Sequence, residues 1–361
     1  MGERAMRKVL VLGAGKIGGA IVDMLSATGD YDIAVADRDP AFLAMVAREK
    51  ARQSQVDVSD AVALRRLADG TDAVISALPF FLNPTVAAVA GEVGAHYFDL
   101  TEDVATTRAV RALAERGETA FAPQCGLAPG FISIVAAHLA KRFDSLRTVH
   151  MRVGALPQFP VNGLKYNLTW STDGLINEYC NPCEAIHEGA PIELMPLEGL
   201  EHFSLDGIDY ETFNTSGGLG TLCETLDGKV QSLNYKTVRY PGHRDVMKLL
   251  LEDLRLRDRR DLLKDVLETA VPITHQDVVL IFVTVSGMRE NRLTQETYAK
   301  KIYACEIDGR LMSAIQITTA AGICAMVDLH RDGKLPARGF IRQEQAELDD
   351  FLTNRFGRYY A

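Results

Sequence analysis

A short segment in the second half of the sequence, residues 235–244 (YKTVRYPGHR), concentrates cationic and proton-transferring side chains in a chain of net charge -9. In an extended strand, Lys236 and Tyr240 lie on one face and Arg239 on the other, and one face is expected to meet solvent. An arginine fork binds a carboxylate through two hydrogen bonds, so Arg239 is the candidate carboxylate ligand. His243 is a candidate acid or base because the pKa of imidazole suits proton transfer, with packing as its alternative role.

A glycine-rich stretch near the start, GAGKIGG, follows an apolar segment at residues 9–12 and opens an amphipathic helical pattern. In dinucleotide-binding βαβ units the first glycine makes a tight turn, the second lets the backbone approach a pyrophosphate, and the third lets helix and strand pack closely. Gly13, Gly15 and Gly18 have this spacing, and the N-terminus of the helix favours an anion. The alternative is an ordinary βαβ turn without a ligand.

The end of the next strand pattern, residues 31–39 (YDIAVADRD), bears on the type of nucleotide. Asp37 can accept hydrogen bonds from the adenosine ribose and repels a 2'-phosphate, which favours NAD over NADP, although Arg38 can pair with a phosphate. Because ligands of parallel sheets lie beyond the carboxyl ends of the strands, the segment 77–79 is expected to contribute as well. The expected cofactor contacts are Gly13, Gly15, Lys16, Ile17, Gly18, Asp37, Arg38, Ala77, Leu78 and Pro79.

The elements that position these residues alternate in type through the first third of the chain. Apolar strand patterns at residues 55–60, 72–79, 95–103 and 119–126 are separated by helical patterns of about ten residues. This alternation predicts a doubly wound parallel sheet of the Rossmann type, in the α/β class. Asp99 ends one of these strands and is a candidate general base or amine anchor; capping of the following helix is its alternative role.

The pattern changes after residue 126. A helix is expected at 132–143, followed by strands in which apolar and polar residues alternate, as in antiparallel sheets with one solvated face. We therefore expect an α+β substrate domain with a mostly antiparallel sheet at 127–317, after a nucleotide domain at 1–126. A C-terminal helix and tail, 318–361, should pack back on the nucleotide domain. The expected strands are 148–156, 164–172, 230–240, 277–287, 296–307 and 311–322.

Composition excludes several functional classes. Lys plus Arg is 39 against Asp plus Glu 48, which disfavours a nucleic-acid partner. No apolar segment reaches the length of a membrane span, and Gly13 and Gly15 interrupt the first apolar run, so neither a span nor a secretory signal is expected. Six scattered cysteines indicate reduced thiols and a cytoplasmic location. Cys180, Cys183 and His187 lack a fourth ligand, so no metal is expected.

Four further motifs occur in a fixed order after the glycine-rich stretch: CGLAPG, YNLTWSTDGLINEY, YETFNTSGGLGTL and YKTVRYPGH. With these motifs, the sequence from Val9 to about Leu335 resembles the saccharopine dehydrogenase-like family, and within it is most similar to lysine 6-dehydrogenase. The resemblance implies NAD-dependent oxidation of a C–N bond in an amino acid. For lysine, the 6-amino group would leave as ammonia and the 6-semialdehyde would cyclise to piperideine-6-carboxylate.

The resemblance also implies a set of site residues. Lysine and saccharopine both carry an α-carboxylate. An acidic protein needs a local cation to bind this group, which fits Arg239. The turn after the third motif offers hydroxyls and backbone amides to a carboxylate through Thr215, Ser216 and Gly217. Tyr166 is a candidate wall for the aliphatic stem of the substrate. The expected catalytic residues are Asp99 and His243, and the expected substrate contacts are Tyr166, Thr215, Ser216, Gly217, Arg239 and Tyr240.

Other functions stay open at this point. Saccharopine dehydrogenase activity is the first alternative, and a nucleotide-binding sensor without catalysis is the second. An imine reductase that makes a polyamine such as carboxynorspermidine would need acidic groups where Arg239 stands. Exposed antiparallel strand edges in the second domain make a homodimer the expected assembly.

Overall fold

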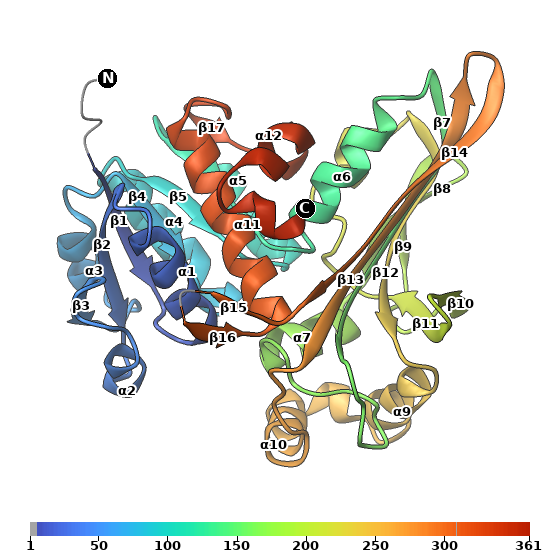
Figure 1. The fold of residues 1–361 in the computed structure, drawn as a ribbon, viewed down its shortest axis with the longest axis horizontal. Helices are drawn as coiled ribbons and strands as arrows, with labels where there is room; N and C mark the ends of the chain where they lie inside the picture. The colour runs from blue at the N-terminus through green and yellow to red at the C-terminus, as the bar shows by residue number, and fades with distance from the viewer. Residues whose placement is uncertain (1–5, 308) are drawn as a thin grey trace. The chain divides into compact units, whose positions relative to one another are not determined.

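The computed structural model describes residues 6–307 and 309–361, and their contacts divide the chain into two compact units. The first unit comprises Met1–Phe131 together with Gln316–Ala361, and the second comprises Ile132–Ile315. Figure 1 shows the elements of each unit in sequence colours. In the described part of the chain, no helix is both long enough and apolar enough to cross a membrane.

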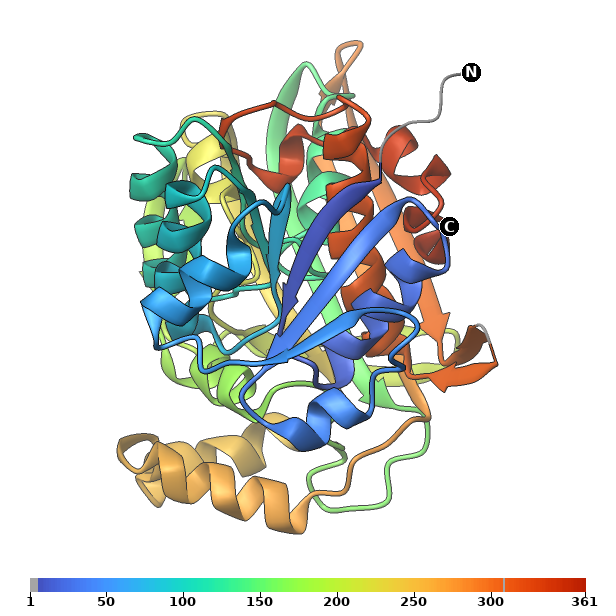
Figure 2. The same cartoon turned by 90° about the vertical axis from the view of Figure 1, so that its left-hand side faces the viewer.

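The first unit contains a seven-stranded sheet in the order β17-β6-β5-β4-β1-β2-β3, in which every pairing is parallel. The blue strands of this sheet run side by side in Figure 2. The order reverses between β1 and β4, and such a switch point opens a crevice beyond the carboxyl ends of the strands. The strands are β1 Arg7–Leu12, β2 Tyr31–Asp37, β3 Arg52–Gln55, β4 Ala73–Ser76, β5 His96–Asp99, β6 Ala120–Ala122 and β17 Gly339–Phe340.

Helices connect successive strands of this sheet, and the apolar side chains between them form a core. Leu10, Val74 and Tyr97 are among its fully buried members. The helices of this unit are α1 Lys16–Ser26, α2 Pro40–Ala44, α3 Ala61–Ala68, α4 Asn83–Glu92, α5 Val104–Ala114, α11 Ala314–Arg331 and α12 Leu348–Thr353, with short 3-10 turns at Phe80–Leu82, Gln343–Gln345 and Gly357–Tyr360.

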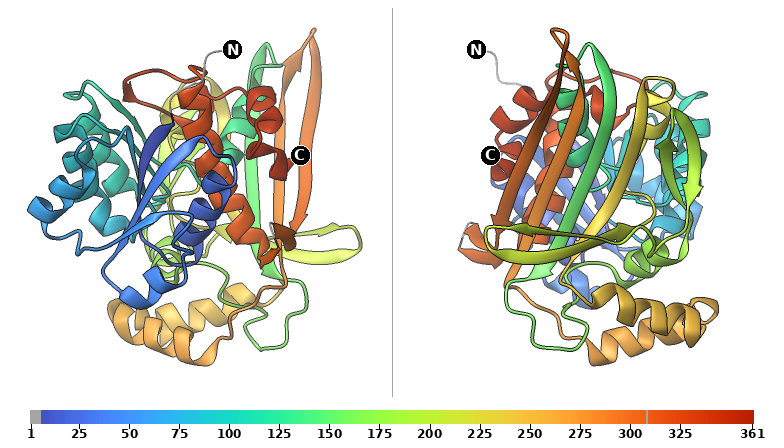
Figure 3. Two further views of the ribbon diagram at one scale, coloured as in Figure 1. Left: turned by 60° about the vertical axis from the view of Figure 1, so that its left-hand side comes forward. Right: turned by 90° about the vertical axis from the view of Figure 1, so that its right-hand side faces the viewer.

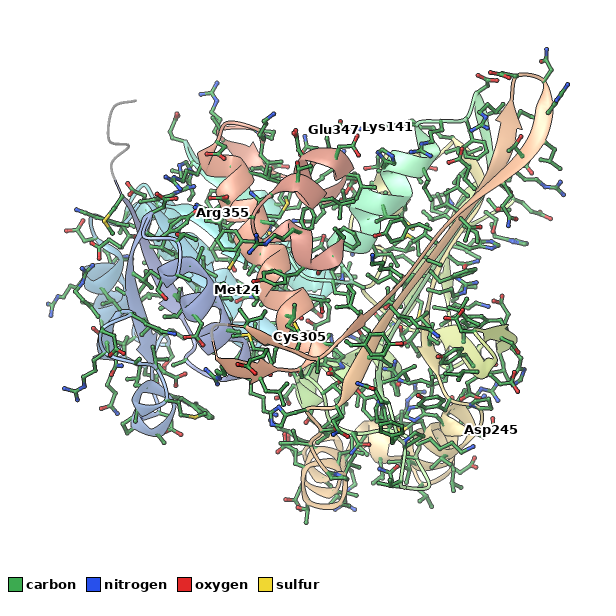
Figure 4. All side chains as sticks on the ribbon, in the orientation of Figure 1. Met24, Lys141, Asp245, Cys305, Glu347 and Arg355 are labelled. Atoms are coloured by element: carbon green, nitrogen blue, oxygen red, sulfur yellow. The ribbon has the colours of Figure 1, made fainter. Side chains whose placement is uncertain are left out.

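Hydrogen bonds and ion pairs connect the C-terminal segment to the start of β1 and β2. Arg355, labelled in Figure 4, binds the carboxylates of Asp30 and Asp328, and Asp328 also accepts a hydrogen bond from the hydroxyl of Tyr31 at 2.6 Å. The guanidinium of Arg7 donates to the carbonyl of Val327 in α11. These contacts place 316–361 in the same unit as the parallel sheet.

The second unit contains an eight-stranded sheet whose main path is β10-β11-β12-β7-β13-β14, with β8 and β9 attached to β12. All of its pairings are antiparallel except β7 with β12. The long strands are seen side by side on the right of Figure 3. The strands are β7 Ser145–Pro157, β8 Cys183–His187, β9 Ala190–Leu194, β10 Glu201–Leu205, β11 Ile208–Asn214, β12 Val230–Arg239, β13 Asp277–Arg289 and β14 Arg292–Tyr303, beside a two-stranded ribbon of β15 Cys305–Ile307 and β16 Arg310–Met312.

A second core forms where the helices of this unit meet the end of β12. Tyr166, Tyr179, Phe213 and Met247 belong to it and are nearly inaccessible to solvent. The helices are α6 Phe131–Ala140, α7 Thr172–Cys180, α8 Leu222–Leu226, α9 His243–Lys248 and α10 Arg260–Ala270, with the short turns Leu249–Asp253 and Leu256–Asp258 between the last two. The α/β class, the parallel Rossmann-type sheet and the mostly antiparallel second sheet are all confirmed.

Three local predictions were wrong. The strand expected at 164–172 is irregular chain with a single bridge between Leu168 and Ile273, because the side chain of Asn162 hydrogen-bonds both backbone groups of Tyr166 and holds a turn there. The strand expected at 311–322 is mostly helix α11. The strand expected at 55–60 lies at 52–55 instead, and Asp57 turns the chain by accepting the backbone N–H of Ser59.

Candidate functional site

The glycine-rich turn between β1 and α1 is shaped by close approaches of the backbone. Gly13 has φ +94°, and a Cβ there would lie 2.8 Å from the carbonyl oxygen of Ala77. A Cβ at Gly18 would lie 1.8 Å from the carbonyl oxygen of Gly13. A Cβ at Gly15 would meet no atom of the described residues within 4 Å, so this position faces open space. The turn therefore leaves one face of its backbone free to receive a ligand at the N-terminus of α1.

Asp37 lies at the carboxyl end of β2 and contacts the same turn. Its carboxylate accepts the backbone N–H of Ala14 at 2.7 Å and that of Asp39 at 2.9 Å. Asp37 is half-buried, whereas Arg38 and Lys16 are exposed. An open turn, a helix N-terminus and a carboxylate beside them fit the pyrophosphate and ribose of a dinucleotide.

Ile17 is half-buried in the first turn of α1, and Ala77, Leu78 and Pro79 follow β4 across the switch point from Gly13. The backbone N–H of Ala77 donates to the carbonyl of Leu12, and a methyl carbon of Leu78 would lie 3.3 Å from a Cβ at Gly13. These expected cofactor contacts therefore gather around one end of the sheet.

Asp99 ends β5 at the same edge of the sheet and is fully buried. Its carboxylate accepts hydrogen bonds from the Tyr97 hydroxyl at 2.7 Å and from the backbone N–H groups of Thr101 and Gln124. Burial raises the pKa of Asp99 to about 6. Asp99 does not cap the following helix, because Asp103 does so. This carboxyl group ties the ends of β5 and β6 together.

Arg239, the last residue of β12, is 2% exposed and lies among aromatic rings. Its Nε donates to the hydroxyl of Tyr179 at 2.9 Å, and its Nη1 donates to the hydroxyl of Thr237 at 2.6 Å and to the carbonyl of Val238 at 2.8 Å. The guanidinium carbon lies 4.9 Å from the centre of the Tyr166 ring, in cation–π geometry. The hydrogen bonds to Tyr179, Thr237 and Val238 and the ring of Tyr166 thus restrict the orientation of the guanidinium.

Arg239 forms no ion pair with any described residue. Among the described residues, no carboxylate lies within salt-bridge distance of it, and Nη2 has no hydrogen-bond partner. The buried residue Glu178 precedes Tyr179 on α7 and influences the guanidinium electrostatically. A buried cation without a paired anion is costly, so the site is suited to an anionic ligand.

His243 is the first residue of α9 and is fully buried. Its Nδ1 lies 2.8 Å from the carbonyl oxygen of Leu164, and its Nε2 lies 3.1 Å from the hydroxyl of Tyr179. Burial, reinforced by the nearby Arg239, lowers the pKa of His243 to about 3. The imidazole is therefore neutral near pH 7, an environment that does not favour the predicted role in proton transfer.

The predicted substrate turn lies beside α7 in the same unit. Thr215 and Ser216 are buried, and the backbone N–H of Ser216 donates to the carbonyl of Glu178. The hydroxyl of Thr215 is buried without a hydrogen-bond partner in the described part of the protein. Gly217 has φ +85°, which turns the chain away from β11.

Lys236 and Tyr240 lie on the opposite face of β12 from Arg239, as strand alternation predicts. The expectation that one of the two faces meets solvent is wrong at these positions, because Lys236 is buried as well as Arg239. Lys236 is paired with Glu201, as is Arg152 from β7. The hydroxyl of Tyr240 donates to the carbonyl of Pro157. The structure therefore does not bring Tyr240 together with Arg239.

Sequence reasoning missed Tyr179 and Thr237, the two hydroxyl residues that hold Arg239. Tyr179 lies in the quoted motif YNLTWSTDGLINEY, but its segment gives no sign of which β-strand it will contact. Thr237 is two residues before Arg239 on the same strand face, so alternation alone could have indicated it.

The cysteine motif CNPC contains no disulfide: Cys180 and Cys183 are both free. In the described residues there is no cluster of three or more histidine, cysteine, aspartate or glutamate side chains that could hold a metal ion.

Comparisons with known proteins match both parts of the chain to domains of one family. The Saccharopine dehydrogenase NADP binding domain matches residues 9–122, and the Saccharopine dehydrogenase C-terminal domain matches residues 126–356. A curated relative is the saccharopine dehydrogenase [NADP(+), L-glutamate-forming] of Saccharomyces cerevisiae, 25% identical over 270 residues; the match covers 70% of this chain but only 59% of that enzyme's length.

A solved structure shares the whole fold. It is the apo, histidine-tagged saccharopine dehydrogenase (L-Glu forming) from Saccharomyces cerevisiae, with a TM-score of 0.79 at 17% sequence identity over 97% of this chain and 98% of that one. Residues 9–122 of the first unit thus match a family domain that binds a nicotinamide dinucleotide. The chain belongs to the saccharopine dehydrogenase family.

Proposed function

We propose that the protein is an NAD-dependent dehydrogenase that removes the 6-amino group of L-lysine by oxidation. The observation that carries this proposal is the buried guanidinium of Arg239, which has no carboxylate partner among the residues that the structure describes. A substrate α-carboxylate would supply that partner through charge-assisted hydrogen bonds. Thr215, with its unsatisfied hydroxyl, and the aromatic ring of Tyr166 are the further proposed contacts.

The chemistry divides between the cofactor and the chain. When bound, the nicotinamide supplies an acceptor for the hydride that leaves the carbon bearing the amine. Water then hydrolyses the substrate imine, which releases ammonia and the 6-semialdehyde. The chain must orient the substrate and move protons, and Asp99 stays the predicted acid or base because a pKa of about 6 suits that task.

Asp37 supports NAD as the cofactor, since a carboxylate at the end of β2 accepts ribose hydroxyls and repels a 2'-phosphate. The exposed Arg38 beside it is the feature that would favour NADP, which the matching yeast enzyme uses according to its name. Because the first Asp37 oxygen already accepts from Asp39 and the second from Ala14, the carboxylate is fixed in place toward the glycine turn.

Saccharopine dehydrogenase activity is the second candidate, favoured by the names of the matching domains and relative. Saccharopine carries three carboxylates, whereas lysine carries one. Two further buried cations in the described part of the second unit, Arg152 and Lys236, are already paired with Glu201. A single unpaired buried guanidinium therefore suits the smaller anion better.

Formation of NADH separates the candidates. The purified protein is incubated with NAD in parallel reactions that contain L-lysine, saccharopine or 1,5-diaminopentane. The diamine is lysine without its carboxylate. We expect L-lysine to give the highest kcat/KM. A preference for saccharopine would establish the second candidate, and a preference for the diamine would remove the proposed role of Arg239.

A further inference from the structure

We propose that Tyr179 and His243 are positioning residues that fix the direction of the Arg239 guanidinium for the substrate carboxylate through a one-way chain of hydrogen bonds. The inference rests on the proposed function, because it takes Arg239 as the carboxylate ligand. It gives His243 a role other than the proton transfer expected from its residue type.

The direction of these hydrogen bonds follows from the last acceptor, the carbonyl oxygen of Leu164. The carbonyl oxygen of Leu164 can only accept, so the hydrogen of the imidazole lies on Nδ1 of His243, 2.8 Å away. The other ring nitrogen, Nε2, is then an acceptor, and the hydroxyl of Tyr179 donates to it across 3.1 Å. That leaves the Tyr179 oxygen to accept from Nε of Arg239 at 2.9 Å.

Each link is protected from water and held by packing. Tyr179 and His243 are completely buried, and their rings meet edge to face at 5.9 Å between centres. Tyr166 and Phe213 pack around the imidazole, with ring centres 5.3 and 6.3 Å from it. A buried hydrogen bond that has lost its partner cannot be replaced by water, so the chain has a single arrangement.

Neutrality of the imidazole is required for this arrangement. A protonated His243 would turn Nε2 into a donor facing the Tyr179 hydroxyl and would place a second cation beside Arg239. The burial that lowers the pKa of His243 to about 3 keeps the ring neutral at working pH. The same burial makes this ring unsuitable for proton exchange with a substrate.

The other hydrogen bonds of Arg239 determine which of its donors stays available to a ligand. Nη1 is occupied by Thr237 and Val238, and Nε is occupied by Tyr179. With these donors committed and the ring of Tyr166 covering one face, Nη2 is the donor available to a ligand. Releasing Nε would let the guanidinium rotate and would weaken carboxylate binding without removing the charge.

Binding of L-norleucine tests the first link. This amino acid has the α-carboxylate of lysine but no 6-amino group, so isothermal titration calorimetry with NAD present measures binding without turnover. Tyr179→Phe should weaken its Kd about 10-fold. Tyr210→Phe is the matched control, because it removes the hydroxyl of another buried tyrosine of the same unit, on the far side of the sheet near Tyr240; it should bind like the wild type.

A pair of variants at His243 tests the second link. His243→Gln cannot transfer protons, but its side-chain oxygen can accept from Tyr179 at the place of Nε2, whereas His243→Leu offers no acceptor. We expect the Gln variant to bind L-norleucine at least 5-fold more tightly than the Leu variant, and to keep more of the turnover of L-lysine. A proton-transfer role predicts instead that both variants lose turnover equally while binding is unaffected.

The outcomes separate the inference from the function on which it rests. If the wild type binds L-norleucine but Tyr179→Phe and both His243 variants bind it equally well, the positioning role is overturned and the proposed function stands. If the wild type neither binds L-norleucine nor oxidises L-lysine, the proposed function fails and takes this inference with it. Should Tyr179→Phe fail to fold, as judged by its thermal melt, the comparison of Gln with Leu at His243 still decides.

Discussion

Among single residues, Arg239 is the one on which the proposed binding of lysine depends most. A charge-assisted pair in a desolvated site contributes on the order of 1.5 to 3 kcal/mol, and each 1.36 kcal/mol changes a rate tenfold. Arg239→Ala should therefore lower kcat/KM for L-lysine by roughly 10- to 150-fold. Arg239→Lys should recover only part of the loss, since an ammonium group cannot keep the hydrogen bonds to Tyr179 and Thr237 while it also binds a carboxylate.

The matched control for this prediction is Lys236→Ala, which removes a buried cation three residues away on the other face of β12. Its effect should appear in thermal stability, because it removes one of the two cations paired with Glu201, and not in the choice of substrate. Normal oxidation of lysine by a folded Arg239→Ala protein would show that the carboxylate is bound elsewhere.

Asp37 carries the second residue-level prediction. Its carboxylate should make kcat/KM with NAD higher than with NADP, because it repels a 2'-phosphate. Asp37→Ser should shift the ratio of the kcat/KM values for the two cofactors toward NADP by about 10-fold, because the exposed Arg38 can then pair with the 2'-phosphate. Steady-state rates with each cofactor give the ratio, and equal or better use of NADP by the wild type would show that Arg38 dominates.

Sequence alone could indicate Arg239 and not the residues that orient it. The arginine stands in a strand pattern whose alternation fixes its face, and its chemistry points to a carboxylate. Tyr179 comes from a helix 60 positions away and reaches Arg239 only through tertiary packing. The pKa of His243 likewise depends on burial by distant segments, so residue type alone gave it a role that its surroundings disfavour.

At the scale of elements, the turn between β1 and α1 allows a matched pair of substitutions. Gly18→Ala would force a Cβ against the carbonyl of Gly13, so α1 must move away from β1. Gly15→Ala meets no protein atom and has an ordinary φ of -68°. We expect Gly18→Ala to lower the thermal midpoint, and Gly15→Ala to keep it while weakening NAD binding.

Fluorescence titration of NAD and a thermal melt of each variant check this pair. If Gly15→Ala bound NAD as tightly as the wild type, the open face of the turn would not be where the pyrophosphate lies. A stable Gly18→Ala protein would mean that the close approach of α1 to β1 is not needed.

Elements defined by local pattern were predicted well, and elements defined by distant contacts were not. The glycine turn and the alternating strands of the first unit follow from short-range signals. The start of α11 at Ala314 does not, because the carboxylate that accepts the N–H groups of Ala314 and Ile315 belongs to Asp277, 37 residues earlier. The segment 164–172 has the strand pattern but finds no sheet partner beyond one bridge.

For the molecule as a whole, acid should destabilise the first unit through two neighbouring histidines, the half-buried His96 and the buried His330. His330 of α11 and His96 of β5 have ring centres 4.4 Å apart, and Nη2 of Arg7 lies 3.0 Å from Nδ1 of His330. Burial is the main cause that lowers the pKa of each histidine to about 4. Protonation in the folded state is thus opposed by burial and by a neighbouring cation.

The sign of the effect follows from proton uptake. In the unfolded protein these histidines bind protons near pH 6.5, and in the folded protein only near pH 4. Their contribution to the free energy of unfolding is therefore fully present above pH 6.5 and is lost as the pH falls toward 4. From pH 7 to 5, His330 should remove about 1 to 2 kcal/mol from the free energy of unfolding. Urea unfolding of the wild type and of His330→Gln measures it, and an unchanged pH dependence in the variant would contradict the assignment.

The central proposal for the whole molecule is that it removes the 6-amino group of L-lysine in an NAD-dependent oxidation. The most direct test uses L-lysine isotopically labelled at the 6-nitrogen, with NAD in excess, and follows NADH and ammonia together. We predict one ammonia for each NADH, with the label in the ammonia. Unlabelled ammonia, or NADH formed from saccharopine with no reaction of lysine, would contradict the account.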